Sequence, residues 1–226
     1  MTALYMGAGY HGGAYLFFHV IFGSRWHRVA AGFLPVTMFT ISMLLATILH
    51  WDRFDFRHFP FLLWFGLYIA TPFLVPWLWL RNRDVDPGKP EASDVVVPSL
   101  ARRGLQGLGV VMLGFAVASF AIPEITFRLW PWALTPLTAR VLGGWFALLG
   151  VGGLVISADS RWSAWKAGLE SIALWHLLVL VGAVIRRQDF NNGSLINWYL
   201  LSVLLVLIGM VVLYIAMEMK SRETTR

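Results

Sequence analysis

Residues 195–217 read LINWYLLSVLLVLIGMVVLYIAM and contain no Asp, Glu, Lys or Arg. A helix needs about 20 predominantly apolar residues to cross the hydrocarbon core of a bilayer, which is roughly 30 Å thick. This stretch is therefore long enough and apolar enough to span a membrane. Comparable runs without a charged residue occupy residues 29–51, 58–80 and 104–123.

The composition of the 226-residue chain agrees with a membrane protein. Hydrophobic residues make up 58% of the chain and charged residues only 13%, whereas soluble domains carry roughly 25% charged residues. These values exclude a soluble enzyme, a nucleic-acid-binding domain and a disordered chain. The sequence has no cysteine, which excludes disulfides, thiolate nucleophiles, iron–sulfur clusters and cysteine-ligated zinc.

The lengths of the apolar runs predict an all-α membrane protein with seven transmembrane helices. A β-barrel is excluded because its strands alternate over about 10 residues, and these runs do not alternate. Two thirds of the 18 Lys and Arg residues fall at the C-terminus and after the first, third and fifth expected helices. The positive-inside rule then places the C-terminus in the cytoplasm and Met1 outside. The expected helices are residues 2–22, 29–50, 59–80, 103–122, 136–157, 166–186 and 195–218.

A polar stretch at residues 81–103 divides the chain. It contains Asp-Pro-Gly at 86–88 and Lys-Pro at 89–90, which are signals for turns and loops. The stretch therefore predicts a cytoplasmic linker between a first part, residues 1–80, and a second part, residues 104–226.

The two parts resemble each other. The chain matches itself when it is shifted by 136 residues, and by 134 residues after a small gap. The first three expected helices therefore resemble the last three, which predicts a parallel repeat whose axis runs along the membrane normal. The helix at 103–122 has no counterpart in the first copy, so we expect that its leading helix is missing or that the native start lies upstream. The matched elements are Ser24-Arg25-Trp26 with Ser160-Arg161-Trp162, and Arg53, Asp55 and Phe56 with Arg187, Asp189 and Phe190.

The repeated elements fall at the expected ends of helices. An Arg–Asp pair beside interfacial aromatic residues can fix a helical hairpin against lipid headgroups. The functional alternative is a pseudo-symmetric outer binding surface made of Arg53, Asp55, Arg187 and Asp189.

Residues 130–146 read WPWALTPLTARVLGGWF. Together with the Ser-Arg-Trp and Arg-x-Asp-Phe elements, this segment resembles a group of uncharacterised multi-pass bacterial membrane proteins. The resemblance covers most of the chain and implies residence in the bacterial cytoplasmic membrane, but no activity. The surrounding segment 123–136 is expected to lie along the outer face, with Trp130 and Trp132 at the membrane interface.

Two histidines, His11 and His176, fall near the middle of different expected helices. Ionisable groups at that depth are functional candidates because burying them is costly. Two facing imidazoles can ligate haem b, which makes a haem-binding redox protein one alternative. The other alternative is that each histidine is neutral and hydrogen-bonded to a neighbouring helix. No other cofactor is predicted.

Two further motifs are excluded by their context. Residues 7–12 match the dinucleotide fingerprint G-x-G-x-x-G, but they lie inside an apolar helix rather than between a strand and a helix, so no nucleotide is expected. The last expected helix has no lysine within its apolar stretch, which excludes a retinal Schiff base.

Glu170 is the acidic residue expected well within a span. Lys166 lies one turn earlier, where an i,i+4 pair would neutralise the carboxylate, and His19 lies at a similar depth. A proton relay through Glu170, His19 and His176 is the functional hypothesis. No second carboxylate accompanies Glu170, so we expect no catalytic residue and no metal site.

These observations favour a structural or accessory membrane subunit that contacts the lipid bilayer and other membrane proteins through its glycine-rich helices. One alternative is a small transporter or lipid-handling protein built on the repeat, with a polar path along Thr37, Thr40 and Thr47. Another alternative is the haem-binding redox protein. Neither nucleic acid nor nucleotide is an expected partner.

Overall fold

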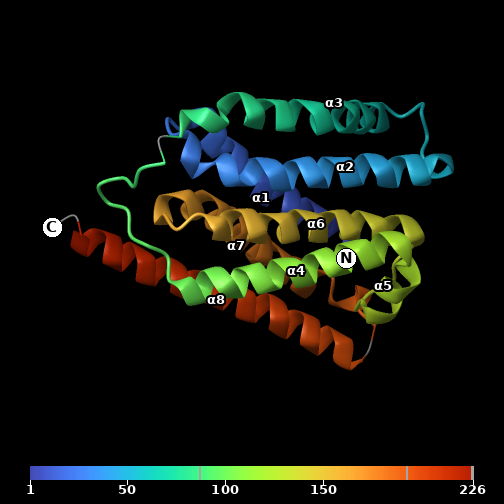
Figure 1. The fold of residues 1–226 in the computed structure, drawn as a ribbon. Helices are drawn as coiled ribbons and strands as arrows, with labels where there is room; N and C mark the ends of the chain where they lie inside the picture. The colour runs from blue at the N-terminus through green and yellow to red at the C-terminus, as the bar shows by residue number, and fades with distance from the viewer. Residues whose placement is uncertain (87, 192, 225–226) are drawn as a thin grey trace.

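The computed structural model describes residues 1–86, 88–191 and 193–224 and is almost entirely helical (Figure 1). The all-α prediction is confirmed. Long apolar runs form helices in a membrane because a helix satisfies its own backbone hydrogen bonds. The helices of the described residues are α1 (Thr2–Phe22), α2 (Phe33–Leu49), α3 (Phe59–Asn82), α4 (Ser99–Ala121), α5 (Pro123–Leu129), α6 (Pro136–Ala158), α7 (Trp162–Ile185) and α8 (Ser194–Thr224).

Six segments of the described chain are long and apolar enough to cross a membrane. They correspond to six of the seven expected spans. The remaining one, α1, is a helix of 21 residues but is not among them. Its two histidines and three tyrosines make it less apolar than the other long helices. The six segments are Ala30–Leu49, Phe59–Val85, Ser99–Ala121, Pro136–Ala158, Trp162–Ile185 and Leu195–Thr224.

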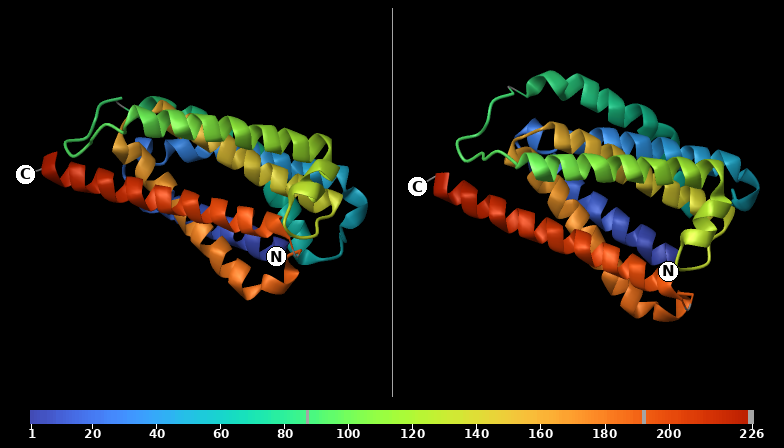
Figure 2. Two further views of the ribbon diagram at one scale, coloured as in Figure 1. Left: turned by 90° about the horizontal axis from the view of Figure 1, so that it is seen from below. Right: turned by 60° about the horizontal axis from the view of Figure 1, so that its bottom comes forward.

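The long helices lie side by side in one bundle (Figures 1 and 2). Helix α6 packs against α4 and α2, and α2 also packs against α3. Helix α1 packs against α7, which packs against α8. The end of the bundle that holds Met1 and α5 is called the Met1 end, and the opposite end, which holds the linker between α3 and α4, is called the linker end.

Glycines bring the backbones of α4 and α6 into contact. A Cβ atom added at Gly109 would lie 2.9 Å from the carbonyl oxygen of Gly150, and one added at Gly153 would lie 3.0 Å from the carbonyl oxygen of Leu105. Small residues are what permit helices to approach so closely in a membrane. The glycine-rich sequence of α6 therefore positions α4 along its length.

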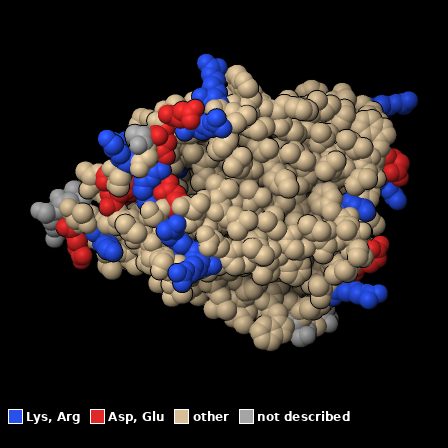
Figure 3. Space-filling view, viewed as in Figure 1, with Lys and Arg blue, Asp and Glu red and all other residues tan. Residues whose placement is uncertain are grey.

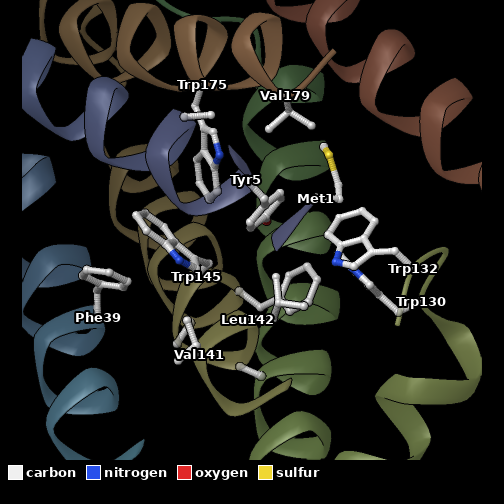
Figure 4. Close-up of a cluster of buried hydrophobic side chains, with 14 of the residues drawn as sticks. Met1, Tyr5, Phe39, Trp130, Trp132, Val141, Leu142, Trp145, Trp175 and Val179 are labelled. Carbon is white, nitrogen blue, oxygen red and sulfur yellow. The ribbon is translucent and has the colours of Figure 1, made fainter. Parts of the chain in front are cut away.

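An aromatic core fills the interior of the bundle toward the Met1 end (Figure 4). It contains Tyr5 of α1, Trp145 of α6 and Trp175 of α7, and the rings of Trp145 and Trp175 lie 4.9 Å apart. Aromatic pairs at such separations stabilise beyond the area that they bury. The core thus joins helices from both expected copies of the repeat.

Trp130 and Trp132, expected among the aromatic residues at the membrane interface, are buried within the bundle. Their side chains are 8% and 2% exposed and belong to the aromatic core. After α5 the chain enters the bundle in an extended conformation, and the indole nitrogen of Trp132 donates a hydrogen bond to Thr2 Oγ1 at 2.8 Å. An indole placed at the end of a span can therefore face neighbouring helices instead of lipid headgroups.

Candidate functional site

The two mid-membrane histidines each use Nδ1 within their own helix. His11 Nδ1 lies 2.7 Å from the carbonyl oxygen of Gly7, and His176 Nδ1 lies 2.8 Å from that of Ile172. His11 is exposed on the surface of α1, whereas His176 is half-buried. No hydrogen bond or ring contact joins them in the described part of the chain. The structure therefore does not pair these residues, and haem ligation by them gains no support.

Glu170 accepts hydrogen bonds from two tyrosines. Tyr15 of α1 donates to Oε2 at 2.7 Å, and Tyr214 of α8 donates to Oε1 at 2.8 Å. The expected pair with Lys166 is not formed, because Lys166 donates to Glu218 of α8 at 2.9 Å. Glu170 thus holds three helices together instead of pairing along its own helix.

Among the described residues, His19 contacts the hydrogen-bonded group around Glu170 through Tyr15. The two rings lie 4.7 Å apart, and His19 Nδ1 lies 3.1 Å from the Tyr15 carbonyl oxygen. In the described residues no direct contact links His19 to Glu170 or to His176. The proton relay remains a prediction, and the geometry shown is that of a structural hydrogen-bond network.

Replacing Glu170 with alanine is expected to lower the free energy of unfolding by about 2 kcal/mol, because two phenol hydroxyls lose a carboxylate acceptor. Thermal unfolding in detergent measures the change. Glu124→Ala is the matched control, since Glu124 is exposed on the short helix α5. Equal effects of the two substitutions would contradict this role for Glu170.

The two Arg-x-Asp-Phe elements at the Met1 end differ in their contacts. Asp189 pairs with the amino group of Met1 and with Arg186, 2.9 Å away, and Phe190 is buried against Trp132. In the element at residues 53–56, Arg53 pairs with Asp52 at 3.3 Å, and both side chains are largely exposed. Asp55 lies 3.2 Å from His58, and Phe56 stacks near Trp51.

Neither arginine of these elements contacts the aspartate two residues after it. In the described chain, no ion pair links Arg53 or Asp55 to Arg187 or Asp189 either. The paired outer binding surface therefore remains a prediction, and the second element serves to hold the start of α1 at the end of α7.

The linker end carries the densest group of charges, as Figure 3 shows on one face of the molecule. Arg161, just before α7, donates to Asp86 of the linker and to Asp159 at the end of α6, each at 2.6 Å. The Arg161 side chain is only 12% exposed. This triad, Asp86–Arg161–Asp159, fastens the linker to the corner between α6 and α7.

A second group, around Glu91, fastens the linker to the corner between α1 and α2. Glu91 accepts from Arg28 at 2.8 Å and 2.5 Å, lies 2.8 Å from His27 Nε2, and lies 3.2 Å from Arg25. The Glu91 side chain is 8% exposed. The linker therefore contacts both Ser-Arg-Trp elements: its Glu91 pairs with Arg25, and its Asp86 pairs with Arg161.

The end of the linker pairs directly with the chain before α7. Val97 N donates to the Ser160 carbonyl oxygen at 2.9 Å, and Trp162 N donates to the Val95 carbonyl oxygen at 3.1 Å. Asp94 accepts from the backbone and hydroxyl of Ser163, at 2.8 and 2.9 Å. Val95 and Val97 are buried with Trp162 and Trp165 in a small core.

Sequence reasoning treated the linker as a divider and missed these acidic residues. A signal was available, because the linker carries Asp84, Asp86, Glu91 and Asp94 on the side expected to be rich in arginine. The pairing of these acidic residues with arginines could not be predicted from local sequence, because Asp86 and Arg161 are 75 residues apart.

The linker is expected to detach in acid. The Arg161 guanidinium lowers the pKa of Asp86 from 3.8 to about 2, and Arg28 lowers the pKa of Glu91 from 4.5 to about 2. Because both pKa values are depressed by folding, their stabilisation is complete above about pH 4.5 and is lost as the pH falls toward about 2. The apparent Tm should fall over this range. It should fall less steeply in a double variant, Asp86→Asn with Glu91→Gln, and equal slopes would contradict the assignment.

The aromatic core contains polar groups without a conventional partner. Among the described residues, the indole nitrogens of Trp130, Trp145 and Trp175 and the hydroxyl of Tyr199 are buried and make no hydrogen bond. They lie against other rings, and Trp130 and Tyr199 are 5.3 Å apart. The cluster therefore buries four polar atoms among aromatic rings.

These features define a multi-pass helical membrane protein whose long helices contact the lipid bilayer. Comparisons of the chain with protein-family models, with curated proteins and with solved structures found no match. Within the described residues, no group of three or more His, Asp or Glu side chains is arranged to hold a metal ion. The function is therefore inferred from the surfaces of the bundle.

Proposed function

We propose that this protein is an accessory membrane subunit that binds a transmembrane helix of another membrane protein along α1. The observation that supports this proposal is a stripe of small residues on α1, formed by Gly7 and Ala14, that no other described helix covers. A parallel internal repeat, in which α1 corresponds to α6, accounts for the stripe.

The corresponding stripe on α6 is covered by α4. A Cβ atom added at Gly143 would lie 2.9 Å from the Phe120 ring, and one added at Gly150 would lie 2.7 Å from Leu113. Small residues at these positions therefore let α4 lie close to α6.

A shift of 136 residues carries Gly143 and Gly150 of α6 to Gly7 and Ala14 of α1, whereas Gly153 falls on Phe17. A Cβ atom added at Gly7 would meet nothing within 4 Å, and Ala14 is exposed. The opposite face of α1 is occupied, since Gly12 lies against Ser171 of α7. Helix α1 thus has the small residues for a helix contact on a face that remains open.

The packing of the other helices supports the repeat. Helix α1 packs on α7 as α6 packs on α2, and α2 packs on α3 as α7 packs on α8. In this scheme the partner helix lies on the open face of α1 as α4 lies on α6. His11 lies near the stripe with Nε2 unused by its own helix, so a polar side chain on the partner would stabilise the contact.

The transporter alternative has less support. A path between the two sets of three helices would cross the aromatic core, where Trp145 and Trp175 are each 3% exposed. The proposed location is the bacterial cytoplasmic membrane, with the C-terminus in the cytoplasm and Met1 outside. The positive-inside rule and the resemblance carried by residues 130–146 support this location.

The absence of cysteine in the chain allows a clean test. In native membranes, Ala14→Cys labelled with benzophenone maleimide should form a photo-adduct with one protein. Phe73→Cys is the control, because Phe73 is 73% exposed on α3 and should label lipid only. Adding Gly7→Leu should abolish the Ala14 adduct without lowering the Tm, since it fills the open stripe. The proposal is overturned if Ala14 labels lipid alone, or if the adduct persists with Gly7→Leu.

A further inference from the structure

Two adjoining hollows lie at the linker end, where α2, α3, α6 and α7 meet. The smaller, about 150 Å³, is lined by charged and apolar residues together, and the larger, about 490 Å³, opens between the linker and the corner of α6 and α7. They share Val155, Asp159 and Arg161 as lining residues. The pair forms one depression at the boundary between the apolar spans and the polar linker.

The charged wall of the smaller hollow is the Asp86–Arg161–Asp159 triad. Two carboxylates meet one guanidinium there, so the triad carries one net negative charge. The side chains of Asp86 and Asp159 are 21% and 26% exposed, whereas that of Arg161 is 12% exposed. Each of the four carboxylate oxygens accepts a hydrogen bond from Arg161, so the net negative charge of the triad and the remaining oxygen lone pairs are what attract a cation.

The rest of the lining of the smaller hollow is mostly apolar and aromatic, with His27 as one titratable side chain. It includes Leu34 of α2 and Trp79 of α3, with Ala30, Ala31 and Ala164 beside them. An indole ring attracts organic cations through its π face, and alanine leaves room for a hydrocarbon group. Carboxylates on one wall and an indole on the other suit a cation with an apolar substituent.

Two arginines near the depression are bonded to other partners. Arg102 of α4 donates to the carbonyl oxygens of Ser157 and Ala158 at 2.8 and 3.2 Å. Arg28 is bonded to Glu91, which also pairs with His27. His27 lines the smaller hollow and is paired with Glu91, and Lys89 lies between Gly88 and Pro90, which line the larger one.

We propose that this depression binds an organic ammonium ion, between the carboxylates of Asp86 and Asp159 and the indole of Trp79. The ammonium belongs either to the headgroup of an ethanolamine phospholipid or to a free amine. The proposal is independent of the partner helix on α1, because the residues that line the depression lie outside α1.

Native mass spectrometry of the purified full chain in detergent tests the proposal with three probes: dioleoyl phosphatidylethanolamine, dioleoyl phosphatidylglycerol and free ethanolamine. The ethanolamine lipid should bind in preference to the glycerol lipid. Binding of free ethanolamine at similar strength would assign the site to a soluble amine, and its absence would assign it to the lipid. Failure of both ammonium probes to bind overturns the proposal.

Asp86→Asn should weaken binding of the ammonium probe about fivefold, since it removes the net negative charge of the triad. Asp84→Asn is the matched control, because Asp84 is 89% exposed and does not line the depression. Ala31→Leu should also weaken binding, because the larger side chain fills the hollow without changing its charge. This second variant tests the site even if Asp86→Asn unfolds the linker. Equal binding by Asp86→Asn and Asp84→Asn, or unchanged binding in Ala31→Leu, overturns the site.

Discussion

Gly109→Val is expected to lower the free energy of unfolding by about 3 kcal/mol, because it forces apart two backbones that are in contact. The new Cβ would lie 2.9 Å from the Gly150 carbonyl oxygen and 3.3 Å from the Leu154 nitrogen. Backbone atoms in the middle of two helices cannot move aside as a flexible side chain can. The whole of α4 must therefore shift away from α6.

Thermal or SDS-induced unfolding in mixed micelles measures this change. Gly114→Val is the control, since Gly114 lies on the same helix and a Cβ there would meet nothing within 4 Å. The two substitutions alter helix propensity equally, so the difference between them reports the α4–α6 contact alone. If Gly114→Val destabilises as much as Gly109→Val, close packing of these helices is not what holds α4.

Arg161→Ala is expected to cost about 3 to 5 kcal/mol, because it leaves the carboxylates of Asp86 and Asp159 facing each other without their cation. The guanidinium is 12% exposed and bonds both aspartates at 2.6 Å. The same substitution at Arg25 should cost less than about 1 kcal/mol, since that side chain is 54% exposed and makes a single contact with Glu91 at 3.2 Å.

The comparison is informative because Arg25 and Arg161 hold the same place in the two Ser-Arg-Trp elements. Unfolding of both variants at neutral pH and low salt gives the measurement. Restoring stability to Arg161→Ala by adding Asp86→Asn would confirm that the loss comes from unpaired charge. Similar costs for Arg25→Ala and Arg161→Ala would show that exposure does not decide the strength of these pairs.

The sequence predicts the long helices well because a membrane span is decided locally, by hydropathy and length. Helix α8 shows this, since its apolar run defines the span without reference to any other segment. Helix α1 shows the limit. Its histidines and tyrosines lower its hydropathy, yet it packs along α7.

The site at the linker end is decided by contacts between distant residues. The pairs Asp86–Arg161 and Arg28–Glu91 join segments that are 75 and 63 residues apart. Local rules instead favoured a pair of Glu170 with Lys166, one turn away on the same helix. Instead, tyrosines from two other helices donate hydrogen bonds to Glu170, and Lys166 pairs with Glu218 of α8. Tertiary packing therefore decides the partners of both residues.

The packing of α1 on α7 has a consequence for biogenesis. Helix α1 is made before α7, and Gly12 can contact Ser171 only after some 159 further residues have been made. Before α7 is made, α1 can already contact earlier segments, since the Tyr10 hydroxyl lies 2.7 Å from that of Tyr68 on α3 and Gly9 lies against Trp145 of α6. The contact of α1 with α7 can therefore form only after these other contacts of α1 are available.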